Sequence, residues 1–333
     1  MSIRIGMNIG HRNPDATRRA AQAAEAAGLD YISMGDAQVH RRECYAMLTL
    51  CALATERIGL ALIVTNPLTR HPTVTADAMA TVNEISKGRA VLGIGRGNAS
   101  VLNAKMDRAH PKVLGEAIDT IRSAWGQVAN STWPRLGWTE PPTIPILVHT
   151  SGRPTAQVAA DHADGVVFRW GDEDPERLGE RIAWMRAARA KGPRAGDPFA
   201  VWGLNTVVVT DDPERAKKTV DLAYRLLSLP EREWPPAFAS RIREYRGRYQ
   251  WPFHASKTNK TNKRILDELG LTELTYARSA FIDTPERIGA RMAELGRVGV
   301  DAVVCSLEDE DPASATDERR IADVAAIRRA ARA

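Results

Sequence analysis

The sequence predicts an α/β protein of the (β/α)8 TIM-barrel class, and three observations lead to that fold. Short apolar segments alternate with longer amphipathic segments along the chain, and regular strand–helix alternation is typical of a parallel sheet covered by helices. Eight such units fit into 333 residues, which is long enough for one barrel with insertions. Residues 58–64, IGLALIV, are apolar throughout, as expected of a strand buried on both faces. A doubly wound open sheet is the structural alternative.

The first half of the chain contains four of the expected strand–helix units. Proline marks two helix starts, at Pro14 and Pro72, because its fixed φ suits the first helical turn. Gly28 follows an alanine-rich amphipathic segment and marks the end of its helix. The expected strands are residues 3–9, 29–34, 58–64 and 89–94, and the expected helices are residues 14–27, 43–54, 71–86 and 111–129.

The second half repeats the alternation but is interrupted twice. Residues 130–144 hold prolines and two tryptophans, and residues 229–275 are long, aromatic and basic. We expect residues 229–275 to lie over the active-site mouth of a single domain spanning 1–333; a surface excursion or a dimer contact is the alternative. The expected strands are residues 145–149, 165–168, 200–209 and 300–306, and the expected helices are residues 154–161, 175–191, 213–227 and 317 to the end.

The composition is that of an ordinary globular enzyme, with 44% hydrophobic and 26% charged residues. The net charge of +5 comes largely from arginines on helix faces, which are expected to be solvated. No dense basic block with interleaved aromatics occurs, so nucleic-acid binding is not expected. Three cysteines without a CxxC pair, no apolar signal core and no run of membrane-spanning length together predict a cytoplasmic protein outside the membrane.

Ligand-binding residues of a parallel barrel lie where its strands end. Five expected strands are followed by glycine or polar residues, as a ligand cradle requires. These residues are Asn8, then Gly35, Asp36 and Ala37, then Thr65, Asn66 and Pro67, then Gly95, Arg96, Gly97 and Asn98, and finally His149, Thr150, Ser151, Gly152 and Arg153.

The segment LGIGRGNAS, residues 92–100, follows the fourth expected strand. Its spacing is GxGxG, whereas a dinucleotide fingerprint needs GxGxxG in the first strand–helix turn, so a Rossmann site is disfavoured. In a barrel loop these glycines permit close backbone approach to a flat or phosphorylated ligand. A tight turn without any ligand is the alternative.

The segment HTSGRP, residues 149–154, joins a strand to a helix. A helix N-terminus presents free N–H groups and positive potential to anions, and Arg153 adds a charge beside it. This pattern predicts a phosphate site. The alternative is an ordinary helix start with Pro154 in the first turn.

Metal and nucleophile motifs are missing from the sequence. The seven histidines are scattered without HxH or HExxH spacing, so no metal site is predicted. No GxSxG elbow occurs, which leaves a Ser/His/Asp triad undemonstrated.

Four segments resemble the luciferase-like superfamily, and in particular its branch of deazaflavin-dependent methylenetetrahydromethanopterin reductases. The resemblance covers most of the chain outside residues 229–275, and the block TNPLTRHP followed by ISKGRAVLGIGRG is the most specific. The four segments are AAEAAGLDYISMGD, IGLALIVTNPLTRHPTVTADAMATVNEISKGRAVLGIGRGNA, IPILVHTSGRPTAQVAADHADGVV and FIDTPERIGARMAELGRVGVDAVV.

The resemblance implies a TIM barrel that binds coenzyme F420, a phosphorylated deazaflavin, or alternatively FMN. It implies a bulge on the third strand that supports the ring, with a non-prolyl cis peptide between Ile63 and Val64. It places Asp36, Thr65 and Asn66 near the ring. It also implies two further groups: Gly95, Arg96, Gly97 and Asn98 along the ring edge, and His149, Thr150, Ser151, Gly152 and Arg153 around the phosphate.

Under this resemblance Asp36 is the candidate for orienting substrate or moving a proton, and Asn66 and Arg96 are candidates for polarising ring oxygens. The chain departs from the family pattern at Ala37, where many deazaflavin relatives carry histidine. His40 lies three residues later and either compensates or is a surface histidine. At Asp283 the usual glycine is replaced, which is expected to alter only a turn.

The expected function is hydride transfer between coenzyme F420 and a small organic substrate. One alternative is an FMN-dependent monooxygenase supplied by a separate reductase. A second is a lyase or hydrolase without a redox cofactor, and a third is a non-catalytic flavin-binding relative. A homodimer is the family expectation, and the substrate is not identified by the sequence.

Overall fold

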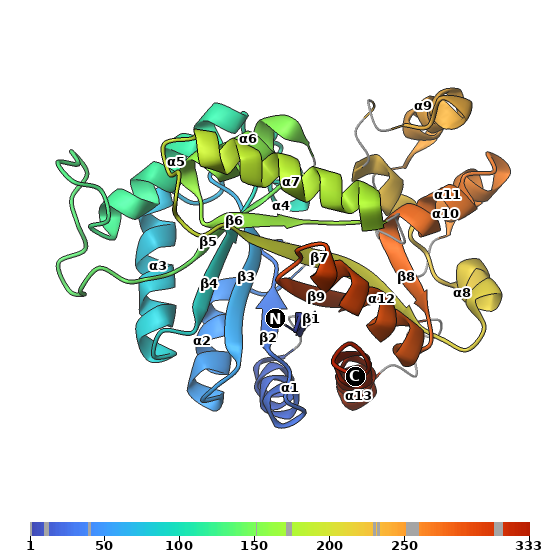
Figure 1. The fold of residues 1–333 in the computed structure, drawn as a ribbon, viewed down its shortest axis with the longest axis horizontal. Coiled ribbons are helices and arrows are strands. Elements are labelled where there is room, and N and C mark those ends of the chain that lie inside the picture. Colours follow the sequence, from blue (N-terminus) through green and yellow to red (C-terminus); the bar gives the residue numbers. More distant parts are fainter. Residues whose placement is uncertain are drawn as a thin grey trace.

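The computed structural model describes residues 2–9, 13–38, 41–150, 152–170, 175–228, 231, 234–250, 260–309 and 316–333. Eight parallel strands close into a barrel because β6 pairs with β7 and β1 pairs with β9 (Figure 1). The predicted TIM barrel is therefore confirmed. Its strands are β1 (Arg4–Asn8), β2 (Tyr31–Met34), β3 (Gly59–Thr65), β4 (Ala90–Ile94), β5 (Ile146–His149), β6 (Gly165–Phe168), β7 (Ala200–Val209) and β9 (Ala302–Leu307).

A ninth strand, β8 (Ala280–Asp283), extends the sheet outside the closed barrel. It pairs with residues 206–209 of β7, beyond the stretch 200–203 that pairs with β6. The 10-residue length of β7 makes room for both neighbours. The sequence analysis assigned no strand here, because four residues carry too little alternation to be recognised. Asp283, the departure from the family pattern, ends this strand, and its Oδ1 accepts the Thr284 N–H at 2.8 Å.

Helices cover the outside of the barrel and begin at the caps that the sequence provides. The Asn13 side chain accepts the Ala16 N–H at 2.8 Å, and Pro14 occupies the first turn. The predicted helix 111–129 ends earlier, at Ala124, where Gly126 with φ +72° turns the chain. The helices are α1 (Pro14–Ala26), α2 (Cys44–Ala54), α3 (Pro72–Ile85), α4 (Ala99–Asn103), α5 (Pro111–Ala124), α6 (Arg153–His162), α7 (Pro175–Lys191), α12 (Pro285–Arg297) and α13 (Asp317–Ala330).

The connection between β7 and β8 differs from the prediction. The expected helix 213–227 breaks at Val220, whose carbonyl accepts a hydrogen bond from the Tyr276 hydroxyl. The Tyr245 hydroxyl likewise donates to the Ala223 carbonyl at 2.8 Å, so the insertion holds this segment in place. The elements of the connection are α8 (Pro213–Thr219), η1 (Ala223–Ser228), η3 (Pro236–Phe238), α9 (Ala239–Arg248), α10 (Thr261–Glu268) and α11 (Thr272–Ser279).

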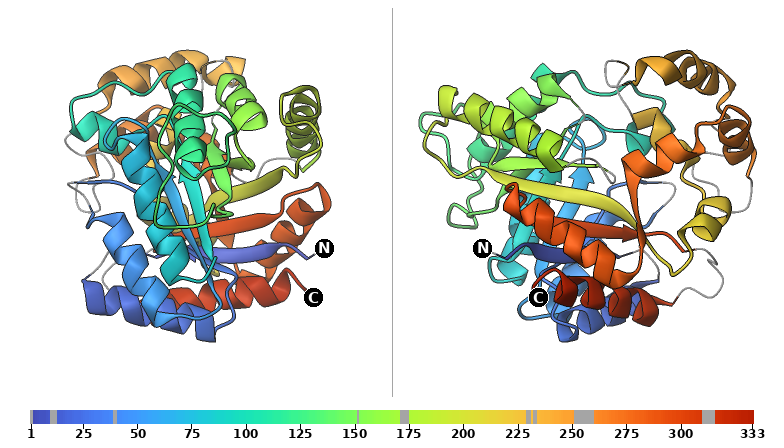
Figure 2. Two further views of the ribbon diagram at one scale, coloured as in Figure 1. Left: turned by 90° about the vertical axis from the view of Figure 1, so that its left-hand side faces the viewer. Right: turned by 45° about the vertical axis from the view of Figure 1, so that its right-hand side comes forward.

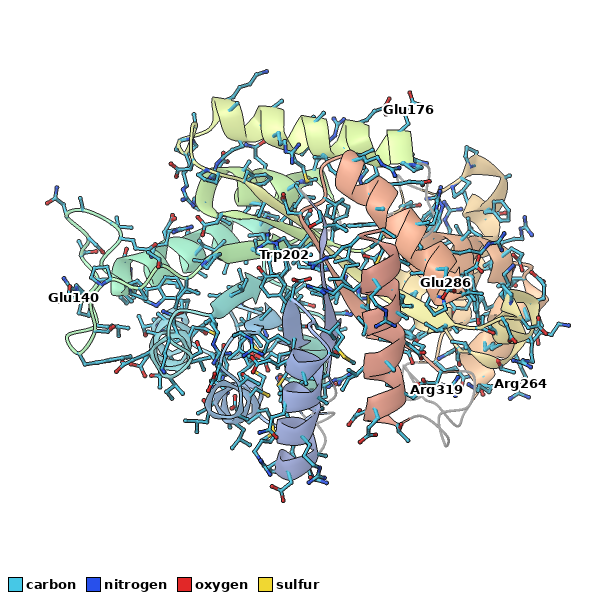
Figure 3. The ribbon with its side chains drawn as sticks, turned by 60° about the horizontal axis from the view of Figure 1, so that its bottom comes forward. Glu140, Glu176, Trp202, Arg264, Glu286 and Arg319 are labelled. Atoms are coloured by element: carbon cyan, nitrogen blue, oxygen red, sulfur yellow. The ribbon has the colours of Figure 1, made fainter. Side chains whose placement is uncertain are left out.

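The barrel interior is filled near the amino ends of the strands. The Tyr31 and Trp202 rings lie 4.5 Å apart, and the Arg4 guanidinium lies over both. In Figure 3 Trp202 lies at the centre of the barrel, whereas the labelled charged side chains lie at its periphery. This packing closes the lower end, so a ligand can enter only from the carboxyl ends. The other interior residues are Ala61, Ile63, Val91, Leu147, Val167, Leu204, Ala302 and Val304.

The last helix ties the chain end to the barrel. Helix α13 lies beside α1 and β1 (Figure 2). Arg328 donates to Asp30 Oδ2 at 3.0 Å, and Arg332 donates to the same oxygen at 2.9 Å. Among the described residues, no helix combines the length and the apolarity needed to cross a bilayer.

Candidate functional site

Strand alternation determines which side chains enter the barrel mouth. Val91, Leu147 and Val167 face the interior, so the residues two and four positions further along each strand point inward as well. On β4 both positions are glycine, whereas the position two residues on is polar at the end of β5 and just after β6. The inward residues at the carboxyl edge are Gly93 and Gly95 after Val91, His149 after Leu147, and Arg169 after Val167.

The third strand carries an irregularity at the predicted place. Its register against β4 shifts between Leu62 and Thr65, and the peptide between Ile63 and Val64 is cis, so both features are confirmed. Ile63 is buried and Val64 is half-buried at the mouth. This bulge forms one side of the candidate cradle.

Gly95 is buried next to the bulge and carries no side chain between β4 and its neighbours. A Cβ placed on Gly95 would lie 3.3 Å from His149 Cβ and 3.6 Å from Val64 Cγ2, close to ordinary contact. A Cβ on Gly93 would lie 2.7 Å from the Leu62 carbonyl oxygen, so the strands themselves require that glycine. The absence of a Cβ at Gly95 therefore avoids a tight contact with His149 and lets a flat ligand approach the β4 backbone closely at the β3–β4–β5 edge.

Asp36 and Thr65 meet at the mouth. The Thr65 hydroxyl donates to Asp36 Oδ2 at 2.8 Å, and the Asp36 N–H donates to the Val64 carbonyl at 3.3 Å. Thr65 is buried and Asp36 is half-buried. The carboxylate is thus held directly beside the bulge.

Asn66 is buried inside the loop that follows β3. Its Oδ1 accepts the N–H groups of Leu68 and Thr69, each at 3.0 Å. Its Nδ2 donates to the Thr69 hydroxyl at 2.9 Å and to the Ser100 hydroxyl at 3.1 Å. The amide has therefore used its two donors and two acceptor positions, and polarising a ring oxygen would require breaking one of these bonds.

The loop after β4 is held largely by its own contacts. The Arg96 Nε donates to the Ala109 carbonyl, and the Ala109 N–H donates back to Arg96 at 2.8 Å. Gly97 has φ +90°, and a Cβ there would lie 2.5 Å from Val101 Cγ1. Arg108 donates to Asn98 Oδ1 at 2.7 Å. Gly97 is thus required by the loop itself, whatever ligand lies above it.

The predicted phosphate residues surround the start of α6. The Thr150 hydroxyl accepts the Gly152 N–H at 3.2 Å and lies 2.7 Å from the Thr155 hydroxyl. Arg153 is exposed, and its guanidinium lies 5.4 Å from the centroid of the Trp184 ring. Ser151, and also His40 in the loop after β2, lie outside the described residues.

A cavity of about 280 Å³ opens at this helix start, and α7 contributes cations that the sequence analysis missed. Thr150, Gly152 and Arg153 line it together with Arg177 and Arg181 of α7. The Glu180 carboxylate also lines the cavity, so three guanidinium groups face one carboxylate beside a helix N-terminus, and the net positive charge favours an anion. No local pattern could reveal this grouping, because α6 and α7 approach each other only in the fold.

A larger cavity of about 530 Å³ lies outside the barrel between α6 and α7. Its described lining includes His162, Trp184 and Lys191 but none of the predicted site residues. It also lies away from the strand ends, so we do not place the ligand ring there.

His149 is neutral at physiological pH. Burial, together with the charges of Arg169 and Arg225, lowers the pKa of this histidine to about 4. Neither arginine was singled out from the sequence. Strand alternation would have revealed Arg169, which lies two residues after the inward-facing Val167, whereas no local signal points to Arg225.

Together these features fit a flat ligand that carries a phosphate. The bulge and Gly95 provide a surface for a ring, and the α6 start with its three arginines provides an anion site. Within the part of the chain that the structure describes, no three His, Cys, Asp or Glu side chains gather as metal ligands would.

The family model for luciferase-like monooxygenases matches residues 2–302, which is most of the chain. The chain belongs to this family. The luciferase-like protein is 29% identical over 300 residues to 5,10-methylenetetrahydromethanopterin reductase of Archaeoglobus fulgidus, covering 84% of this chain and 86% of that one. It is 40% identical over 217 residues to the enzyme of that name from Methanolobus tindarius, covering 62% and 65% of the two chains.

Solved structures agree with the luciferase-like fold. Coenzyme F420-dependent tetrahydromethanopterin reductase from Methanopyrus kandleri superposes with a TM-score of 0.71 at 19% identity, over 98% of each chain. An F420-dependent secondary alcohol dehydrogenase superposes with a TM-score of 0.66 at 14% identity, over 99% of this chain and 98% of that one. At these identities the superpositions support the fold alone.

Proposed function

We propose that this luciferase-like protein is an oxidoreductase that binds coenzyme F420 and transfers a hydride between it and a small organic substrate. The observation that carries the proposal is the pairing of a glycine-lined surface beside the β3 bulge with an arginine-lined cavity at the start of α6. The reductases similar to this chain support the same reaction class. When bound, coenzyme F420 supplies a two-electron carrier, so the protein has to supply position and electrostatics.

The residues of the cradle have distinct roles in this proposal. The Ile63–Val64 bulge supports one face of the ring, and Gly95 leaves room for it. Thr150, Gly152 and Arg153 hold the phosphate, with Ser151 assigned to the same group from the sequence.

Asp36 is the proposed group for orienting substrate or moving a proton. The Thr65 hydroxyl donates a hydrogen bond to Oδ2, which fixes the orientation of the carboxylate. Oδ1 then remains as an acceptor for the substrate or a proton. Because the Asn66 amide is engaged inside its loop, we assign Asn66 to holding that loop beside the ring. Arg96, whose Nε is bound to Ala109, retains terminal N–H groups for a ring oxygen.

The insertion at residues 229–275 is proposed to exclude water from the mouth. Its helix α9 contacts η1, because the Tyr245 hydroxyl donates to Ala223 and Arg246 donates to the Leu227 carbonyl at 3.3 Å. Since η1 carries Arg225, whose charge acts on the mouth residue His149, this contact supports the proposal that the insertion lies next to the mouth. A drier mouth strengthens the electrostatic contacts inside it.

Titration of the purified protein tests the proposal. Three ligands are compared by fluorescence: coenzyme F420, its phosphate-free deazaflavin core, and FMN. The expected order is tight binding of F420, weaker binding of the core because the arginine cavity is unused, and no tight binding of FMN. Tight binding of FMN alone would indicate an oxygenase with a partner reductase, and failure of all three would end the redox proposal.

A further inference from the structure

Two arginines meet on the side of the mouth next to the proposed cradle. Arg169 follows β6, and its Nη1 donates to the Leu204 carbonyl of β7 at 3.1 Å. Arg225 lies on η1, and its guanidinium stacks 4.5 Å from the centroid of the Tyr224 ring. The Tyr224 hydroxyl in turn donates to Glu308 Oε1 at 3.3 Å, just past β9. Residues from three parts of the chain therefore surround one corner of the mouth.

This corner carries an excess of positive charge. Burial, together with the charge of Arg225, lowers the pKa of Arg169 to about 9. The negative charge of Glu308 raises the pKa of Arg169, whereas the charge of Arg225 lowers it. The charge of one carboxylate therefore opposes the charges of two guanidinium groups in this corner. His149 is neutral and Tyr224, whose pKa is raised by burial, keeps its proton, so neither changes the balance. Two like charges that are held close together and only partly compensated lower the stability of the folded protein, so stability does not explain this arrangement.

Two buried polar atoms on the elements that border this corner, β7 and η1, lack a hydrogen-bond partner among the described residues. They are the Arg225 Nε and the Thr206 hydroxyl. Thr206 is fully buried, and it faces the barrel interior because it lies two positions beyond the inward-facing Leu204. Native structures rarely leave buried donors unsatisfied, and those that do occur often mark a ligand site. Both atoms can donate, so the group missing from this corner is an acceptor.

We propose that Arg169 and Arg225 form an anion subsite that binds an acidic group of the substrate, with Thr206 as an additional donor. This inference rests on the proposed function, because the substrate lies beside the cofactor cradle. The chemistry fits an oxyanion, either a carboxylate or a phosphate monoester, since paired guanidinium groups bind both. The subsite is separate from the cavity at the start of α6, where Arg153, Arg177 and Arg181 are assigned to the cofactor.

Simple probes test the subsite while the substrate is unidentified. Benzoate, phenyl phosphate and the neutral isostere benzamide are titrated into the F420-loaded protein and followed by saturation-transfer NMR. We expect one or both anions to bind about tenfold or more tightly than benzamide, as hydrogen bonds to charged groups do. The stronger anion identifies whether a carboxylate or a phosphate is preferred.

Variants connect that preference to the arginine pair. Arg225→Met should abolish the preference for anions, and Arg225→Lys should restore part of it. Arg243→Met removes the same charge from an exposed position on α9 that pairs with Glu231, and it should leave the preference unchanged. F420 and its phosphate-free core should bind Arg225→Met as they bind the wild type.

Three results would overturn the inference. The first is equal binding of benzoate, phenyl phosphate and benzamide to the wild type, a comparison that holds even if Arg225→Met fails to fold. The second is an unchanged preference in folded Arg225→Met. The third is a selective loss of F420 relative to its core in that variant, which would assign the pair to the cofactor phosphate. If F420 does not bind at all, the proposed function fails, while the anion preference is still measured on the protein alone.

Discussion

Gly95 is the position at which a substitution tests the ring surface most cleanly. A side chain on Gly97 would clash with Val101 within the protein, and one on Gly93 would clash with the Leu62 backbone. A Cβ on Gly95 instead meets His149 Cβ at 3.3 Å and Val64 Cγ2 at 3.6 Å, which requires shifts of a few tenths of an ångström at most. Gly95→Ala should therefore fold with a small shift of His149, and the larger side chain of Gly95→Leu should occupy the volume proposed for the ring, with thermal denaturation as the check that it folds.

The expected loss of affinity follows from the contact area. A leucine over this surface removes one face of a fused ring from contact, about 100 Å² of apolar area. At about 25 cal/mol/Å² this loss costs about 2.5 kcal/mol, which is roughly a seventyfold rise in the Kd for F420. Gly95→Ala should give a smaller rise, and the loop variant Gly137→Leu, which has open space around it, should give none.

Fluorescence titration of the three variants, with thermal denaturation as the folding control, measures this prediction. A folded Gly95→Leu that binds F420 as tightly as the wild type would refute the placement of the ring. A loss of affinity of equal size in Gly137→Leu would show that the effect is unspecific.

Three further predictions concern the phosphate site, the chain end and the cysteines. Arg153→Ala should weaken F420 about tenfold but leave its phosphate-free core unaffected, and equal losses for both ligands would move the phosphate elsewhere. Asp30→Asn should lower the free energy of unfolding by about 2 kcal/mol, because it breaks the bonds to Arg328 and Arg332. Burial would raise the pKa of Asp30, but the Arg328 and Ile5 hydrogen bonds outweigh it and lower that pKa. Stability from Asp30 is therefore present above about pH 4 and is lost as the pH falls further, so urea denaturation of the two proteins should converge there; a constant gap would contradict this assignment. The three cysteine thiols, whose pKa values are raised by burial, should resist iodoacetamide until the protein unfolds, and labelling of the native protein would contradict their burial.

The parts of the fold that were predictable from the sequence are those with strong local signals. Apolar runs and helix starts at Pro14 and Pro72 locate the barrel strands and several helices to within a few residues. The cis peptide at Ile63–Val64 followed from the resemblance and is confirmed. These features depend on short stretches of sequence or on a motif, so a single sequence is sufficient to recognise them.

The parts that were missed depend on contacts between distant segments. The helix expected over residues 213–227 breaks at Val220 because Tyr276, over fifty positions away, binds its carbonyl. Strand β8 forms because residues 206–209 of β7 lie beyond the part of β7 that pairs with β6, and β8 pairs with them. The grouping of Arg169 with Arg225 likewise depends on η1 being held against the barrel. Local periodicity contains none of this information.

We propose above all that F420 occupies the carboxyl edge of β3, β4 and β5 and extends to the start of α6. Hydrogen–deuterium exchange with and without F420 measures this placement directly. We predict new protection in residues 63–66, 93–98 and 149–162 and in the first turns of α7. Tight binding of F420 with protection confined to the outer cavity between α6 and α7, around His162 and Lys191, would contradict the claim.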